Sequence, residues 1–130
     1  KKLFNSGFFG DLVRIDCYYF GGWYHNGIHL VDTLNYIFDD NLKIEKVYNK
    51  KKIKDGKDFD VDIKLKFEKN DIEVIFNSIN ENNYQLFEFD IKYTKSRLRI
   101  EDFGNRITYE SKYVNNMNYQ HLLLVKLNYY

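Results

Sequence analysis

Residues 58–68 read DFDVDIKLKFE, an uninterrupted alternation of charged and apolar side chains. Successive side chains of a β-strand point to opposite faces of the sheet, so this stretch would collect its apolar residues on one face and its charges on the other. The apolar set is Phe59, Val61, Ile63, Leu65 and Phe67. The stretch therefore predicts a strand with one buried face and one polar face.

The same period of two recurs along most of the chain. A turn at Lys69–Asp71 leads from this stretch into the next alternating segment, which predicts an antiparallel hairpin. In the first predicted strand, Val13 is expected to face inward with Ile15 and Cys17. The further predicted strands are Leu12–Phe20, Ile72–Ile79, Gln85–Thr94, Arg97–Asp102 and Arg106–Tyr113, with Lys43–Ile53 as a weaker, lysine-rich candidate.

One segment, residues 27–38, follows the helical period instead. Its apolar residues fall in one arc of a helical wheel, and its polar residues fall in the opposite arc. The apolar arc holds Leu30, Val31, Leu34, Ile37 and Phe38, and the polar arc holds His29, Asp32, Thr33 and Tyr36. This pattern predicts an amphipathic helix.

The ends of this helix also have sequence signals. Asn26 is a good N-cap residue, and the cluster Asp39–Asn41 is expected to end the helix. A second, shorter helix is predicted over Asn118–Asn128. The fold class that follows is α+β: a mostly antiparallel open sheet of six to seven strands with one main helix packed on one face.

Composition limits the classes of protein that the chain can represent. Its 130 residues are enough for a single domain, 1–130, with a hydrophobic core. The near balance of 20 Lys and Arg against 19 Asp and Glu argues against a nucleic-acid partner. Apolar runs are too short to span a membrane, and the lone Cys17 fits a reducing, cytoplasmic location. Cys17 itself is expected in the core.

The polar arc of the helix is the candidate for chemistry. His29 would lie in the first helical turn, where the positive helix end favours a neutral imidazole that can act as a general base. Asp32 lies three residues later, close enough to interact with it. The two could equally form a simple surface pair. A metal site on His25 and His29 lacks evident further ligands, so no metal is expected.

The polar sheet face allows two interpretations. It could be solvated, or it could be a contact surface between subunits, because aromatic side chains such as Tyr18 alternate with charges there. The charged residues assigned to it are Arg14, Asp16, Asp60, Lys64, Glu88 and Lys92.

Two segments together resemble a known family. Residues 5–15, NSGFFGDLVRI, and residues 21–38, GGWYHNGIHLVDTLNYIF, are similar to the entry strand and the G-x-H-x-x-D helix of the C-terminal domain of Gfo/Idh/MocA oxidoreductases. The resemblance implies an open antiparallel sheet over the remaining residues. It also implies that the chain is the substrate-binding and oligomerisation domain of a longer enzyme.

The resemblance assigns roles to individual residues. It implies that His29 is the active-site histidine, working beside a lysine of the nucleotide-binding domain to oxidise a sugar or polyol hydroxyl or to reduce the carbonyl. Asp32 matches the acidic residue that follows it. Many members carry Asp four residues before the histidine, where this chain has His25. The residues expected to line the substrate pocket are Trp23, Tyr24, His25, Asn26, Thr33 and Tyr36.

The cofactor is expected to be NAD(P), held elsewhere. None of the 7 glycines belongs to a GxGxxG motif, and a chain without proline has no Glu-Lys-Pro segment. We therefore expect that the N-terminal Rossmann domain is absent and that this chain alone neither binds NAD(P) nor turns over. Its expected partners are that domain, a sugar or polyol, and further copies of itself through the sheet face. The alternative function is a non-catalytic binding or oligomerisation module.

Overall fold

The computed structural model describes residues 1–53, 56–114 and 120–127. One helix, α1 (Ile28–Phe38), follows a π-helical turn, η1 (Trp23–Gly27), and a short 3-10 turn, η2 (Asp102–Gly104), lies near the end of the chain. The strands are β1 (Leu12–Phe20), β2 (Leu42–Lys52), β3 (Phe59–Phe67), β4 (Glu73–Ile79), β5 (Glu88–Tyr93), β6 (Ser96–Glu101), β7 (Arg106–Val114) and β8 (Gln120–Leu127).

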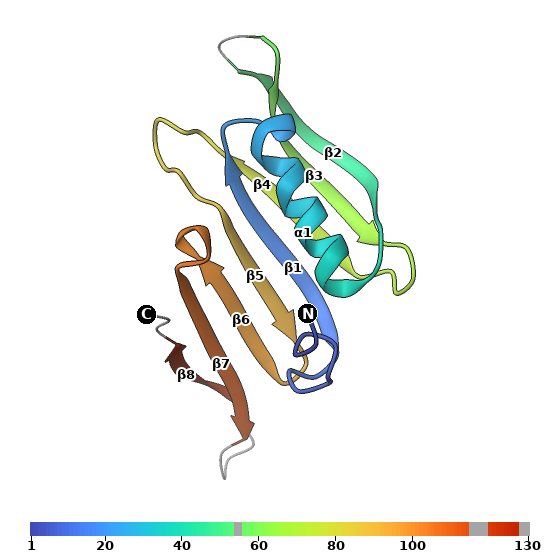
Figure 1. The fold of residues 1–130 in the computed structure, drawn as a ribbon, viewed down its shortest axis with the longest axis vertical. Helices are drawn as coiled ribbons and strands as arrows, with labels where there is room; N and C mark the ends of the chain where they lie inside the picture. The colour runs from blue at the N-terminus through green and yellow to red at the C-terminus, as the bar shows by residue number, and fades with distance from the viewer. Residues whose placement is uncertain (54–55, 115–119, 128–130) are drawn as a thin grey trace.

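All described strands belong to one sheet. Their order is β2-β3-β4-β1-β5-β6-β7-β8, and only the central pair β1 and β4 runs parallel. Figure 1 shows α1 lying over one face of the sheet, across β1, its neighbour β4, and β3 beyond β4. The opposite face carries no helix from the described residues. The predicted α+β fold, a mostly antiparallel open sheet with one main helix, is confirmed.

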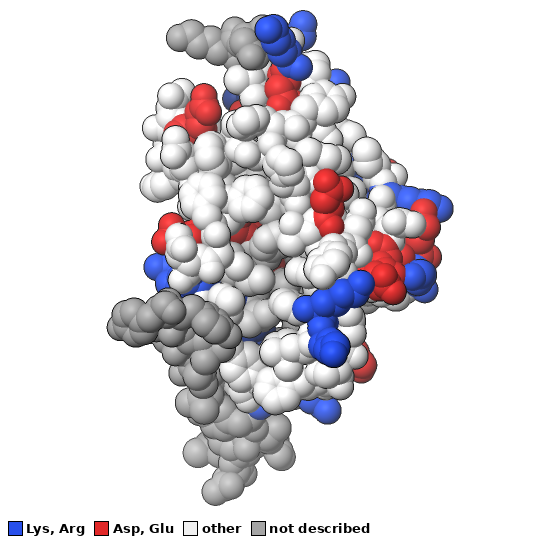
Figure 2. All heavy atoms as spheres, in the orientation of Figure 1, with Lys and Arg blue, Asp and Glu red and all other residues white. Residues whose placement is uncertain are grey.

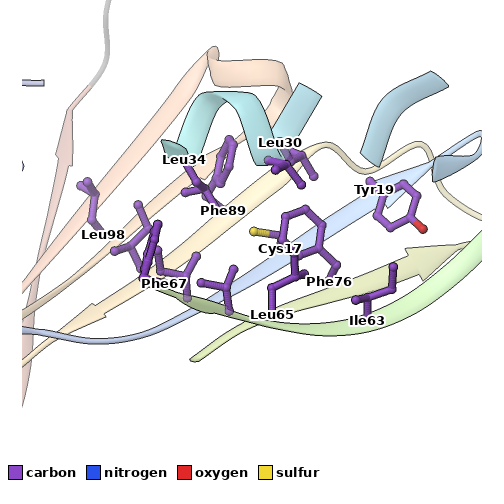
Figure 3. Packing of buried hydrophobic residues seen from close by; sticks show 14 of the residues in the cluster. Cys17, Tyr19, Leu30, Leu34, Ile63, Leu65, Phe67, Phe76, Phe89 and Leu98 are labelled. Atoms are coloured by element: carbon purple, nitrogen blue, oxygen red, sulfur yellow. The ribbon is translucent and has the colours of Figure 1, made fainter. Parts of the chain in front are cut away.

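The core lies between α1 and the sheet. Leu30 and Leu34 point from the helix toward Cys17 and Phe76 on the central strands, and all four are fully buried (Figure 3). Strand β3 supplies Val61, Ile63, Leu65 and Phe67 to the same core, which confirms the face predicted from its alternation. Burial raises the pKa of the Cys17 thiol well above its ordinary value, as expected for a core cysteine.

The C-terminal helix prediction was wrong. Where the sequence predicted a helix over Asn118–Asn128, residues 120–127 form β8, which pairs antiparallel with β7 from Gln120 opposite Val114 to Leu127 opposite Ile107. Residues 118, 119 and 128 lie outside the described residues. A short apolar run fits either a helix or a strand, and here the long-range pairing with β7 decides. The extra strand gives the sheet eight strands rather than six to seven.

The helix predicted over residues 27–38 is confirmed as α1, but Asn26 does not cap it. The π-helical turn η1 precedes α1, so Asn26 lies inside η1 and His29 is one helical turn further from the start of the helical backbone than predicted. The Asn26 amide instead donates a 2.6 Å hydrogen bond to the Phe20 carbonyl. The C-terminal prediction is confirmed, because α1 ends at Phe38 and Asp39 follows in a left-handed conformation.

Strand β1 departs from strict alternation at one point. A register shift between Leu12 and Arg14 in the pairing with β5 puts Leu12, rather than Val13, in line with the buried residues. Val13 is half-exposed, so the prediction that it faces inward was wrong. An extra residue in one strand of a pair shifts the following side chains to the other face.

Candidate functional site

The predicted polar face of α1 points outward from the sheet. His29, Asp32 and Tyr36 are exposed, whereas the intervening Leu30 and Leu34 are buried. Within the described residues, no hydrogen bond or ion pair joins His29 to Asp32, so the imidazole is open to solvent and to a ligand. The structure thus keeps these residues on one accessible face but does not link them directly.

Thr33 and Tyr36 have other contacts on this face. The Thr33 hydroxyl donates a 2.7 Å hydrogen bond to the His29 carbonyl, one turn back. The ammonium of Lys1 lies 4.9 Å from the centre of the Tyr36 ring. Thr33 therefore supports the backbone at His29, and Tyr36 stands beside a positive charge at the far end of the helix.

The predicted pocket residues at the helix start divide into two groups. Trp23 is half-buried, and its ring packs edge-on against Tyr19 and Phe76 at 5.9 and 5.5 Å, so it anchors the turn to the core. Tyr24 and His25 are exposed and line an open depression of about 470 Å³ at the end of the sheet. His29 is not among the residues that line it.

Asp58, which sequence reasoning did not select, organises this end of the site. Its carboxylate accepts hydrogen bonds from the backbone N–H groups of Tyr24 at 3.0 Å and His25 at 2.9 Å. These N–H groups belong to the first helical turn, where no intrahelical partner exists. Asp58 therefore caps the helix from the loop before β3. The two partners are more than thirty positions apart, so no local sequence pattern predicts this contact.

Asp60 and Gly22 complete the support of the turn. The Gly22 N–H donates to the Asp60 carboxylate, whose pKa is raised by burial and by Glu81, with the Gly22 hydrogen bond opposing the rise. Gly22 has φ 100°, and a Cβ there would collide with the Asp58 carboxylate. Glycine is therefore required at this position both by backbone conformation and by the close approach of Asp58.

The open sheet face carries a network of ion pairs. Arg14 and Lys92 both contact Asp16, and Lys92 and Arg97 both contact Asp90. Asp16 and Asp90 are each only 8% exposed. Burial would raise the pKa of each carboxyl, but the hydrogen bonds from the neighbouring cations outweigh burial and hold both pKa values below the ordinary value.

The structure gives no sign of a metal centre in its described part. Among those residues, no three His, Cys, Asp or Glu side chains come close enough together to hold an ion. The described helices also lack the length and hydrophobicity that a membrane crossing requires.

Comparison with solved structures relates this geometry to known folds. No protein-family model matches the sequence, and no curated protein is significantly similar to it. The chain is similar to a super-repressor mutant of Gal80p from Saccharomyces cerevisiae, with TM-score 0.71 and 14% identity over 98% of this chain and 43% of that one. A dehydrogenase, MviM, from Clostridium difficile gives TM-score 0.65 and 15% identity over 95% and 41% of the two chains. A 3-ketoreductase from Actinomadura kijaniata, in complex with NADP, gives TM-score 0.67 and 8% identity over 98% and 42%.

These similarities define the class of fold. It is an α+β domain that occurs within larger proteins, a dehydrogenase and a 3-ketoreductase among them, and this chain spans less than half the length of the proteins it matches. More specifically, the fold is that of the C-terminal domain of Gfo/Idh/MocA-type proteins, which confirms the predicted resemblance at the level of the fold.

Proposed function

We propose that this chain is the substrate-binding half of an NAD(P)-dependent oxidoreductase that acts on a sugar or polyol, and that His29 supplies a proton-transfer group to the reaction. The observation that carries the proposal is the exposed polar face of α1, which holds His29, Asp32 and Tyr36. The opposite face of the same helix is packed against the sheet. An exposed imidazole without a protein partner can accept a proton from a substrate hydroxyl or return it to a carbonyl.

The start of the helix does not fit a dinucleotide site. A dinucleotide pyrophosphate usually binds to free N–H groups at a helix start after a glycine-rich turn. Here the Asp58 carboxylate already accepts the N–H groups of Tyr24 and His25, and its negative charge would repel a phosphate. We therefore assign NAD(P) binding to another domain, and we assign only the substrate side of the reaction to this chain.

The face around α1 suits contact with such a domain. Figure 2 shows this face largely uncharged, with white atoms dominating between scattered red and blue groups. The centres of protein interfaces are depleted in charged residues, so we place the nucleotide-binding domain and the substrate on the α1 side of the sheet. Oligomerisation is assigned to the opposite sheet face, and a cytosolic location fits the single buried thiol of Cys17.

The proposal is tested in the longer protein that contains this chain. His29→Ala should reduce kcat at least a hundred-fold, because general acid-base catalysis contributes about 10²–10⁴-fold. Asp39→Asn, which removes an exposed carboxylate at the other end of α1, is the control and should leave kcat unchanged. Turnover by His29→Ala at the wild-type rate would contradict the proposal.

A non-catalytic assembly module is the second candidate. It is favoured by the buried ion pairs of the open sheet face and by the similarity in fold to a transcriptional regulator, Gal80p of a Kluyveromyces yeast. Val13 is exposed there beside Lys92, Arg97 and Lys112, so Val13→Glu should be tolerated in the folded monomer. If the face joins subunits, sedimentation will show a smaller assembly for this variant. An unchanged mass would count against the interface.

A further inference from the structure

The turn between β6 and β7 holds two consecutive residues in a left-handed backbone conformation. Asp102 has φ 51° and Phe103 has φ 54°. A bulky side chain rarely adopts a positive φ, because its Cβ then lies too close to the backbone. Strain of this kind is concentrated at functional sites.

The strained turn presents an aromatic ring to solvent. The Phe103 ring stacks on Phe87 with centroids 5.8 Å apart and planes 2° apart, and it meets Phe20 edge-on at 6.0 Å. Even so, the Phe103 side chain is 56% exposed. Burial of the ring in the core therefore does not explain the strain. We call Phe20, Phe87 and Phe103 the aromatic platform.

The aromatic platform lies at the same end of the sheet as the candidate site. Strand β1 ends at Phe20, β5 starts directly after Phe87, and β6 ends just before the turn of Phe103. The next residues after Phe20 are the glycine turn that leads into η1, and the Asn26 amide holds the Phe20 carbonyl. The strand end at Phe20 is therefore tied directly to η1, the turn that carries His25.

Three carboxylates lie together at the turn that carries Phe103. Glu101 and Asp102 belong to the turn of Phe103, and the pKa of Glu88 is raised by burial and by Glu101 nearby. The guanidinium of Arg106 is already paired with Glu101 at 3.2 Å. Carboxylates accept hydrogen bonds from hydroxyl groups and repel phosphates. The charge at this end therefore favours an uncharged, hydroxyl-rich ligand.

We propose that the aromatic platform is a ligand subsite for the ring of an uncharged polyhydroxylated compound, whose C–H face lies on Phe103 and whose hydroxyl groups bond to the nearby carboxylates. An apolar surface with a few placed polar groups is the usual composition of a small-molecule site. The inference rests on the proposed function for the class of substrate. It adds where the sugar or polyol ring lies, and it excludes phosphorylated forms.

Binding to the 130-residue chain with ¹³C-labelled phenylalanine tests the subsite by NMR. The probes are myo-inositol, D-glucose and D-glucose 6-phosphate. At least one of the two uncharged probes should shift the platform rings of the wild-type chain, and the phosphate should bind at least ten-fold more weakly than that probe. Shifts confined to other rings, or equal binding of the phosphate, would overturn the proposal.

Two variants separate binding from folding. Phe103→Gly removes the ring but suits the positive φ, so its melting temperature should equal or exceed that of the wild type while binding falls at least ten-fold. Phe8→Ala removes another exposed phenylalanine, which contacts Phe9 and Tyr109, and it should bind as the wild type does. Wild-type binding by Phe103→Gly would overturn the subsite. This binding assay is independent of turnover, so a dispensable His29 would refute the proposed function without affecting its result.

Discussion

The backbone N–H of His25 donates a 2.9 Å hydrogen bond to the carboxylate of Asp58, a residue 33 positions later in the chain. The same carboxylate accepts the N–H of Tyr24, so a loop from one hairpin fixes the start of the helix that carries the candidate site. A carboxylate at this place also complements the positive end of the helix dipole. The orientation of the site therefore depends on a contact between distant segments.

Asp58→Ala should destabilise the chain by about 1–2 kcal/mol, the usual effect of removing a helix cap. Urea unfolding followed by circular dichroism measures this free energy. Asp32→Ala is the control, since it removes an exposed carboxylate on the same helix that has no such capping role, and it should change stability by less than about 0.5 kcal/mol. Equal effects of the two substitutions would show that Asp58 is not a cap.

Gly22→Ala should destabilise the chain by more than an alanine at a position with positive φ usually does. Gly7→Ala is a matched control, because Gly7 also has a positive φ, 77°, but has open space around its Cβ position. The control should cost about 1–2 kcal/mol, and Gly22→Ala should cost clearly more because the new methyl group meets Asp58. In the double variant with Asp58→Ala, the two effects should be less than additive. Strict additivity would contradict the predicted collision.

Acid should destabilise the ion-pair network of the open sheet face. The pKa values of Asp16 and Asp90 are lower in the folded chain than the ordinary value of 3.8. Their contribution to stability is therefore fully present above that ordinary value and is lost as the pH falls through the folded pKa values. Urea midpoints measured from about pH 6 down to about pH 2.5 should decrease over the lower part of this range.

Lys92→Met should change this acid profile. Lys92 contacts both Asp16 and Asp90, so its loss raises both carboxyl pKa values and moves the loss of stability to higher pH. Lys43→Met breaks only an exposed pair with Glu68 and should leave the profile unchanged. Identical profiles for Lys92→Met and the wild type would refute the assigned role of the network.

Cys17 should be protected from thiol reagents in the native chain. It is fully buried and its pKa is raised by burial, so the reactive thiolate forms only after unfolding. Reaction with a disulfide reagent should proceed at the rate of opening and should accelerate with urea. An exposed thiol introduced by Asn82→Cys in a Cys17→Ser background should react at once. Fast labelling of Cys17 in the native state would contradict its place in the core.

Much of the fold follows from spacing within single segments. The alternation around Ile63 and the helical period around Leu34 show which side chains share a face. This depends only on the geometry of one strand or one helix. The same helical period is enough to place His29, Asp32 and Tyr36 on one outward face, where all three are exposed.

Contacts between segments were decided only by the tertiary structure. The cap from Asp58, the stacking of Phe103 on Phe87, and the pairing that makes residues 120–127 a strand each join positions whose proximity depends on strand order. Asp16 lies on the polar face as its phase predicts, yet it is buried because cations from its own and the neighbouring strands cover it. The sequence by itself determined which face each side chain occupies, since that depends on local periodicity. The tertiary structure alone decided which faces and ends meet, because those contacts depend on how distant strands pair.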